Sequence, residues 1–148
     1  MKIRHERIRE AMALLVDLPV KPSNKRRGRK KVAADITDAC FLLGITAPGL
    51  YDDSHPDALS RNTQKIFRWI ESDSPSAIDS ISQLLPAIEL AMPPLLLARL
   101  RSHYSETFRE MLYRKERIDS DFEALFGAMI ALSSRVAGGG SSGNALIH

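Results

Sequence analysis

The sequence has one cysteine, Cys40, and few aromatic residues, 6% of 148 positions. A single cysteine forms no internal disulfide, which excludes a disulfide-stabilised fold and fits a reducing, cytosolic setting. Runs of alternating β-branched residues, which would predict strands, are also lacking. We therefore expect an all-α protein in the cytoplasm.

Long uninterrupted apolar runs are missing as well. The longest, "LLPAIELAMPPLLLARL" at residues 84–100, is interrupted by Glu89 and three prolines, so it does not predict a transmembrane helix. The first ten residues, "MKIRHERIRE", are charged and lack the apolar stretch of a signal peptide. No membrane partner is expected.

Motifs of catalysis or metal binding are absent too. The four histidines show no metal-ligand spacing, and the sequence has no phosphate-binding glycine loop, CxxC or nucleophile elbow. Cys40 is a nucleophile in principle, but it lies on an apolar helix face with no histidine nearby in sequence, which favours a buried structural cysteine. We expect no enzyme, no cofactor, no metal site and no small-molecule substrate.

Charge is distributed unevenly along the chain. Residues 1–71 hold 14 Lys and Arg against 9 Asp and Glu, whereas residues 72–148 hold 7 against 9. The front is therefore basic and the back slightly acidic. This asymmetry indicates an anion-binding front part and a back part with another role.

Several helices are predicted in residues 1–91, which we take as one domain. The periodicity predicts helices over residues 2–17 and 35–43, the second capped by Asp35. Between them, "KRRGRKK" at 25–31 has six basic residues out of seven and predicts an exposed loop. Another helix should start at Pro75, capped by Ser74.

The stretch "RNTQKIFRWI", residues 61–70, has the composition of a helix that enters a DNA groove. The recognition helix of a helix-turn-helix protein needs basic and amide side chains on its wet face and bulky apolar anchors on its dry face. The basic segment before it would contact phosphates. The expected DNA-binding residues are Arg61, Asn62, Thr63, Gln64, Lys65, Arg68, Lys25, Arg26, Arg27, Arg29, Lys30 and Lys31.

A long helix is predicted over residues 92–137, followed by a flexible tail at 138–148. A rod of roughly 65 Å would outgrow a domain about 40 Å across, so its apolar seam would need a second chain. The alternative is a break near "IDSD", residues 118–121, giving two helices that fold back on each other. The expected oligomerisation residues are Leu97, Leu100, Tyr104, Phe108, Met111, Ile118, Phe122, Leu125, Met129 and Leu132.

Long stretches resemble the YdaT family of lambdoid prophages: "MKIRHERIREAM", "LYDDSHPDALSRNTQKIFRWIESDSP" and "LLPAIELAMPPLLLARLRSHYSETFRE". The resemblance implies a POU- or lambda-repressor-like helix-turn-helix head, a long C-terminal helix that assembles a homotetramer, and a CII-like regulator of the lysis–lysogeny decision, nucleoid-associated in a bacterial host. Two departures stand out: the connection after Gly44 exceeds the usual short turn, and the segment 25–31 is longer than in relatives. From the pattern alone a dimer stays open as well as a tetramer.

Three functions compete at this point. The first is a regulator that binds double-stranded DNA. The second is a toxin of a toxin–antitoxin-like pair that acts through a host protein, with the long helix as its docking surface. The third is an assembly module without a DNA role, against which the basic segment argues.

Overall fold

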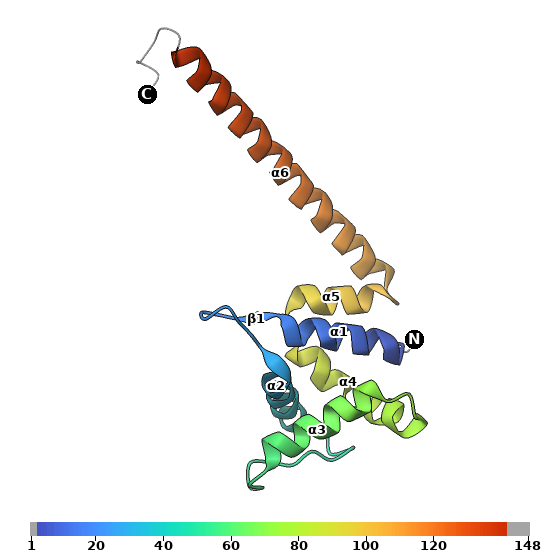
Figure 1. Ribbon diagram of the computed structural model, residues 1–148. Helices are drawn as coiled ribbons and strands as arrows, with labels where there is room; N and C mark the ends of the chain where they lie inside the picture. The colour runs from blue at the N-terminus through green and yellow to red at the C-terminus, as the bar shows by residue number, and fades with distance from the viewer. Residues whose placement is uncertain (1–2, 142–148) are drawn as a thin grey trace. The chain divides into compact units, whose positions relative to one another are not determined.

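The computed structural model describes residues 3–141, and within them the chain is mostly helical, which confirms the all-α prediction (Figure 1). The chain divides into two compact units, residues 1–105 and 106–148. The division lies at 105/106 and not at 91/92, because the helix that follows residue 91 packs with the first unit.

The first unit contains five helices and one short hairpin among its described residues. Helix α2 packs against α1, α3 and α4, and α1 also packs against α5. The hairpin pairs Pro19 with Arg26 and Val20 with Lys25 in antiparallel register. The bounds are α1 His5–Asp17, β1 Pro19–Val20, β2 Lys25–Arg26, α2 Gly28–Leu42, α3 Ala58–Glu71, α4 Pro75–Ala91 and α5 Pro94–Ser102.

One apolar core joins these helices. Burial of aliphatic side chains is the main favourable contribution to such a fold, on the order of 1.5–3 kcal/mol for each large side chain. All five helices contribute, so the core depends on the packing of the whole unit. The largest fully buried side chains include Met12, Leu15, Ile36, Ile66, Ile81, Leu84, Ile88 and Leu100.

The basic segment 25–31 is largely exposed, as its charge predicted, but it is not a loop. Lys25 and Arg26 form strand β2, and α2 begins at Gly28, whose φ of +79° favours glycine. Asp35 therefore lies inside α2, where it pairs with Lys31 at 2.9 Å, and does not cap the helix. The prediction of a loop gave too much weight to repulsion between these cations. Carboxylates from other parts of the fold lie beside several of them.

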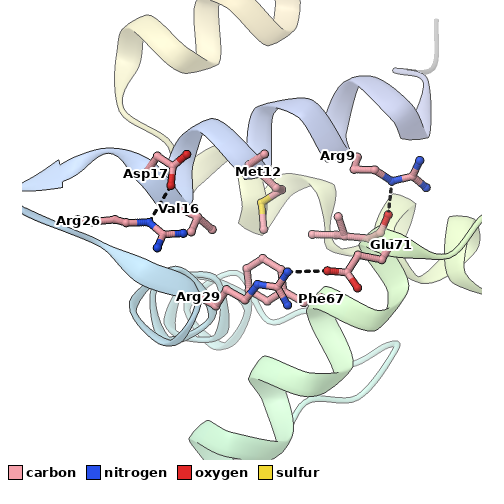
Figure 2. Close-up of a pocket in the computed structure, with 10 residues that line it drawn as sticks. Arg9, Met12, Val16, Asp17, Arg26, Arg29, Phe67 and Glu71 are labelled. Atoms are coloured by element: carbon pink, nitrogen blue, oxygen red, sulfur yellow. Dashed lines mark hydrogen bonds and ion pairs between the residues drawn. The ribbon is translucent and has the colours of Figure 1, made fainter.

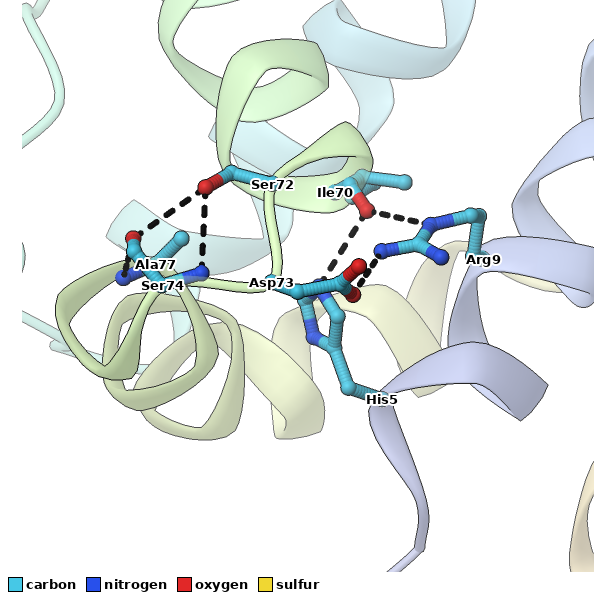
Figure 3. A network of polar contacts seen from close by, with 7 residues as sticks. All are labelled: His5, Arg9, Ile70, Ser72, Asp73, Ser74 and Ala77. Atoms are coloured by element: carbon cyan, nitrogen blue, oxygen red, sulfur yellow. Dashed lines mark hydrogen bonds and ion pairs between the residues drawn. The ribbon is translucent and has the colours of Figure 1, made fainter.

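The C-terminal end of α3 is held by side chains of α1. At its C-terminal end, the Ile70 carbonyl accepts hydrogen bonds from Arg9 Nε at 2.8 Å and His5 Nε2 at 3.1 Å (Figure 3). The hydrogen bond and positive charge of Arg9 hold the pKa of Asp73 below its usual value. Arg9 and His5 thus tie α1 to the turn between α3 and α4.

Helix α4 starts as the sequence predicted. Ser74 Oγ accepts a hydrogen bond from the Ala77 amide at 3.3 Å, and Pro75 is the first helical residue. Pro86 lies inside α4, which continues past it to Ala91 without a split. Ala87 and Ile88 beside it are fully buried, so their packing offsets the lost helical hydrogen bond.

The second unit is the single helix α6, Glu106–Ser141. The continuous helix expected after Pro94 is interrupted at residues 103–105, and α5 ends at Ser102 because Leu96 and Leu100 bury in the core of the first unit. The break considered at 118–121 does not occur. Helix α6 also includes residues 138–141 of the expected tail, and the rest of that tail, 142–148, lies outside the described residues.

Candidate nucleic-acid interface

The wet face of α3 gathers the polar side chains that the sequence predicted for it. Ile66, Phe67 and Ile70 are buried against the core. Because the helix turns by 100° per residue, Gln64 and Arg68 then lie on the opposite side, and both are exposed. Arg61 is exposed beside them, and Lys65 is half-buried at the edge of the same face.

Asn62, one of the predicted DNA contacts, does not belong to this face. Only 2% of Asn62 is exposed. Its Oδ1 accepts a hydrogen bond from the Tyr51 amide, and its Nδ2 donates one to the Tyr51 carbonyl, both at 2.8 Å. The reason is that α3 begins four residues earlier, at Ala58, which turns Asn62 toward the α2–α3 connection.

Thr63 is half-buried, and its hydroxyl donates to the Leu59 carbonyl at 2.6 Å. A threonine that bonds back to its own helix has its donor already engaged. Lys65 is engaged too: Nζ lies 3.1 Å from the Gly49 carbonyl and 4.4 Å from the centroid of the Tyr51 ring. Arg61, Gln64 and Arg68 are the better candidates for base contacts.

Gln64 and Arg68 form a ridge between two clefts. Each cleft has a volume of about 450 Å³, and both residues line both clefts. The first cleft is completed by Arg29, Thr63, Phe67, Glu71 and Ser72. The second is completed by Tyr51, Asp57, Ser60, Arg61 and Lys65.

Arg29 connects the start of α2 to the first cleft. Its guanidinium lies 4.9 Å from the centroid of the Phe67 ring and 2.7 Å from Glu71 Oε1 (Figure 2). Arg29 also lines a smaller cavity of about 210 Å³, whose wall carries a second pair, Arg26 and Asp17, at 2.7 Å. These are exposed ion pairs, which contribute little to stability and exchange partners at low cost.

The other predicted basic residues lie around the start of α2. Arg27 precedes its first turn and Lys30 lies within that turn, whereas Lys25 is on the hairpin. Among the ion pairs of the described residues, none includes Arg27, Lys30 or Lys25. Their charges therefore add to the positive end of the α2 dipole.

Two residues of this site were missed from the sequence. Ser60 is exposed at the start of α3 and lines the second cleft, and Tyr51 lines it from the connection. An earlier helix start would have shown Ser60 one turn before Gln64. No pattern in the sequence indicated Tyr51, because its position depends on the hydrogen bonds to Asn62.

Cys40 is buried, burial raises the pKa of its thiol, and Sγ donates to the Ile45 carbonyl at 3.3 Å. These features make it a poor nucleophile and confirm a structural cysteine. No cluster of three or more His, Cys, Asp or Glu side chains with metal-site geometry occurs in the described part of the chain. None of the described helices is long and apolar enough to cross a membrane.

Comparison with known protein families gives a match over most of the chain. The sequence profile of the family described as "Bacterial toxin ydaT" matches residues 19–133, which include α2, α3, α4, α5 and most of α6. No curated protein matches the chain significantly.

Asn62 provides a direct test of the division between structural and exposed residues on α3. Asn62→Ala should lower the free energy of unfolding by about 1–3 kcal/mol, because it leaves the buried Tyr51 amide and carbonyl without partners. Gln64→Ala, on the exposed face of the same helix, should change it by less than about 0.5 kcal/mol. Urea unfolding followed by circular dichroism measures both. Equal stability of the two variants would contradict a structural role for Asn62.

Proposed function

The chain belongs to the YdaT toxin family, and from that premise we propose that it is a sequence-specific DNA-binding regulator that assembles through α6. The observation that carries the proposal is the ridge of Gln64 and Arg68 between two clefts. In this proposal α2 and α3 form the helix-turn-helix pair of a POU-like head. The regulator acts, CII-like, in the lysis–lysogeny decision of a prophage, in the cytoplasm at the nucleoid.

A protruding ridge with basic flanks matches the shape of the major groove. Glutamine forms two hydrogen bonds with adenine, and arginine forms two with guanine, so Gln64 and Arg68 suit direct reading of base edges. The cations in the clefts at either side, Arg29 on one and Lys65 on the other, then face the two phosphate backbones. B-DNA has the matching arrangement, a major groove with a phosphate backbone on each side.

The start of α2 supplies further phosphate contacts in this proposal. Arg27, Arg29 and Lys30 lie within the first turn of α2 or beside it, where the helix dipole adds to their charge. Phosphate contacts fix the position of a protein on the duplex but carry no sequence information. Their contribution falls as salt rises, because binding releases condensed counterions.

Assembly through α6 is supported by the apolar side chains that the helix leaves exposed. Ile118, Phe122, Leu125, Met129 and Leu132 form a seam along one side, and all are more than half exposed in the single chain. Exposing such a surface to water is costly, and a second copy would cover it. Leu97 and Leu100 are excluded from this surface because they pack in or against the core of the first unit.

The width of the apolar surface favours a tetramer over a dimer. Phe126 is 59% exposed and flanks the seam, and Ile130, 66% exposed, lies one turn further along and farther round the same side of the helix. A two-stranded coiled coil needs only a narrow seam, whereas a helix of a larger bundle carries a third apolar position per heptad. Four helices around a common core would bury Phe126 as well and bring a neighbouring helix toward Ile130. Paired heads on such a bundle would match the two-fold symmetry of a palindromic site.

The family description favours a second candidate, a toxin that acts through a host protein. In that case the exposed side of α6 would dock the partner, and the α3 ridge would play no part in toxicity. The two candidates therefore attribute any toxicity to different surfaces of the chain.

The ridge and the start of α2 should respond differently to mutation. The DNA used is a duplex that the wild-type protein selects from a random library. Gln64→Ala and Arg68→Ala should each weaken binding to this selected duplex by about 1–3 kcal/mol and reduce the sequence preference at one base pair. Lys30→Ala should weaken binding to selected and scrambled duplexes alike and lower the salt slope by roughly one unit. Fluorescence anisotropy at about 0.15–0.2 M salt measures both effects. Wild-type protein that binds the two duplexes equally would refute sequence-specific recognition.

Overproduction separates regulation from direct toxicity. A variant with Gln64, Lys65 and Arg68 all changed to alanine should relieve any growth defect, because the defect would arise from misregulated transcription. The growth rate of bacteria overproducing this variant, compared with wild type at equal protein level, is the measurement. Undiminished harm from the triple variant would support the host-protein toxin instead.

The flanking positions of α6 provide a test of the tetramer. Phe126→Ser combined with Ile130→Ser should convert a tetramer into a smaller species, because the seam alone supports fewer helices. Tyr113→Ser is the matched control, since Tyr113 is as exposed but lies on the opposite side of α6. Light scattering after size-exclusion chromatography gives the mass. A wild-type protein that is a dimer or monomer, or a double variant that stays tetrameric, would contradict this assignment.

A further inference from the structure

The connection between α2 and α3, residues 43–57, is long for a helix-turn-helix protein, and several side chains hold it in place. Cys40 Sγ donates to the Ile45 carbonyl from the end of α2. Asn62 bonds both backbone groups of Tyr51, and Lys65 Nζ donates to the Gly49 carbonyl at 3.1 Å. Hydrogen bonds from both helices therefore order the connection, which makes it a fixed part of the surface beside α3.

Tyr51 is the centre of this ordered connection. Its ring lies 4.4 Å from Lys65 Nζ and 5.8 Å from Arg61 Cζ, measured to the ring centroid. The His55 ring packs against it at a tilt of 39°, with centroids 4.5 Å apart. An aromatic face attracts cations, and the attraction strengthens as the cation loses water. Tyr51 therefore restricts two basic side chains of α3 to one place.

The cleft beside Tyr51 has the chemistry of a phosphate site. Its lining provides three cations, Arg61, Lys65 and Arg68, against one carboxylate, Asp57. The Ser60 hydroxyl and the N-terminal end of α3 add donors and the positive end of the helix dipole. Its volume of about 450 Å³ leaves room for a phosphodiester and its sugar. The excess of positive charge favours an anion.

We propose that the α2–α3 connection is itself part of the DNA interface, and that Lys65, placed by Tyr51, binds one backbone phosphate in this cleft. The inference rests on the proposed DNA-binding function and adds to it. Lys65 is a phosphate ligand and not a base reader. Tyr51 is a positioning residue, and Asn62 holds it in register with α3.

Because Lys65 is held in place before DNA binds, its binding to a phosphate costs less side-chain entropy. A free lysine side chain loses up to about 2 kcal/mol of rotamer entropy when it is immobilised on a ligand. Lys65 has already lost part of this freedom to Gly49 and Tyr51, so less is lost when DNA arrives. Two of its three ammonium hydrogens remain for a phosphate oxygen after the Gly49 carbonyl has accepted one. Loss of the Tyr51 ring should therefore weaken binding without removing a charge.

The test pairs side-chain changes with neutral phosphates. The probe is a duplex that the wild-type protein selects from a random library, made as a series with one methylphosphonate linkage at each position in turn. The variants are Lys65→Met, Tyr51→Leu and Tyr51→Phe. Lys21→Met and Tyr113→Leu serve as controls, because Lys21 is exposed on the hairpin turn and Tyr113 is exposed on α6.

On the unmodified duplex, Lys65→Met should bind about tenfold more weakly, with a salt slope lower by about 0.9. Tyr51→Leu should bind about fivefold more weakly with an unchanged salt slope. Tyr51→Phe, which keeps the ring, and both controls should bind within twofold of wild type. On the duplex neutralised at the contacted phosphate, Lys65→Met and Tyr51→Leu should both lose their deficit. Thermal unfolding of each variant identifies any loss of folding, in which case Lys65→Met and Tyr51→Phe carry the test.

Two results would overturn the proposal separately from the function on which it rests. If wild type prefers its selected duplex but no single neutral phosphate removes the deficits of Lys65→Met and Tyr51→Leu, the two residues act only within the fold. Deficits that change with a base pair and not with a phosphate would make Lys65 a base reader. If wild type shows no preference for any selected duplex, sequence-specific binding itself fails and the proposal fails with it.

Discussion

Burial of Ile66, Phe67 and Ile70 on one side of α3 determines most of what the first unit presents to its surroundings. These side chains pack into the core formed with α2 and α4, so the helix has only one orientation in which its apolar side is dry. Gln64 and Arg68 face water as a result. The polar ridge is thus a consequence of core packing, and side chains far from it, such as Ile36 and Leu84, contribute to its position.

Apolar burial fixes the orientation of α3 about its own axis. Polar contacts fix its position along that axis. Asn62 holds the connection before the helix, and His5 and Arg9 hold the carbonyl of Ile70 near its end. Buried hydrogen bonds add little net stability when they form, yet they are costly to leave unmade, so they select one arrangement among several. Both ends of α3 are therefore held by partners, which suits a surface that must match the spacing of a ligand.

Helix α6 depends on a different balance. The large apolar side chains from Ile118 to Val136 remain substantially exposed. The first unit instead recruits α5 into its own core through Leu96 and Leu100. The chain thus buries one part of its apolar surface in its own fold and leaves another exposed, and residues 103–105 separate the two.

The periodicity of the sequence by itself determined the helical class, the amphipathic face of α3, the start of α4 and the apolar seam of α6, because each depends on neighbours one helical turn away. The long-range contacts were decided only by the tertiary structure. Asn62 and Tyr51 meet through hydrogen bonds across eleven positions, and Arg29 meets Glu71 across forty-two. The start of α2 inside the basic segment and the end of α5 at Ser102 also depended on which faces the core could bury, and local propensity carries no information on that.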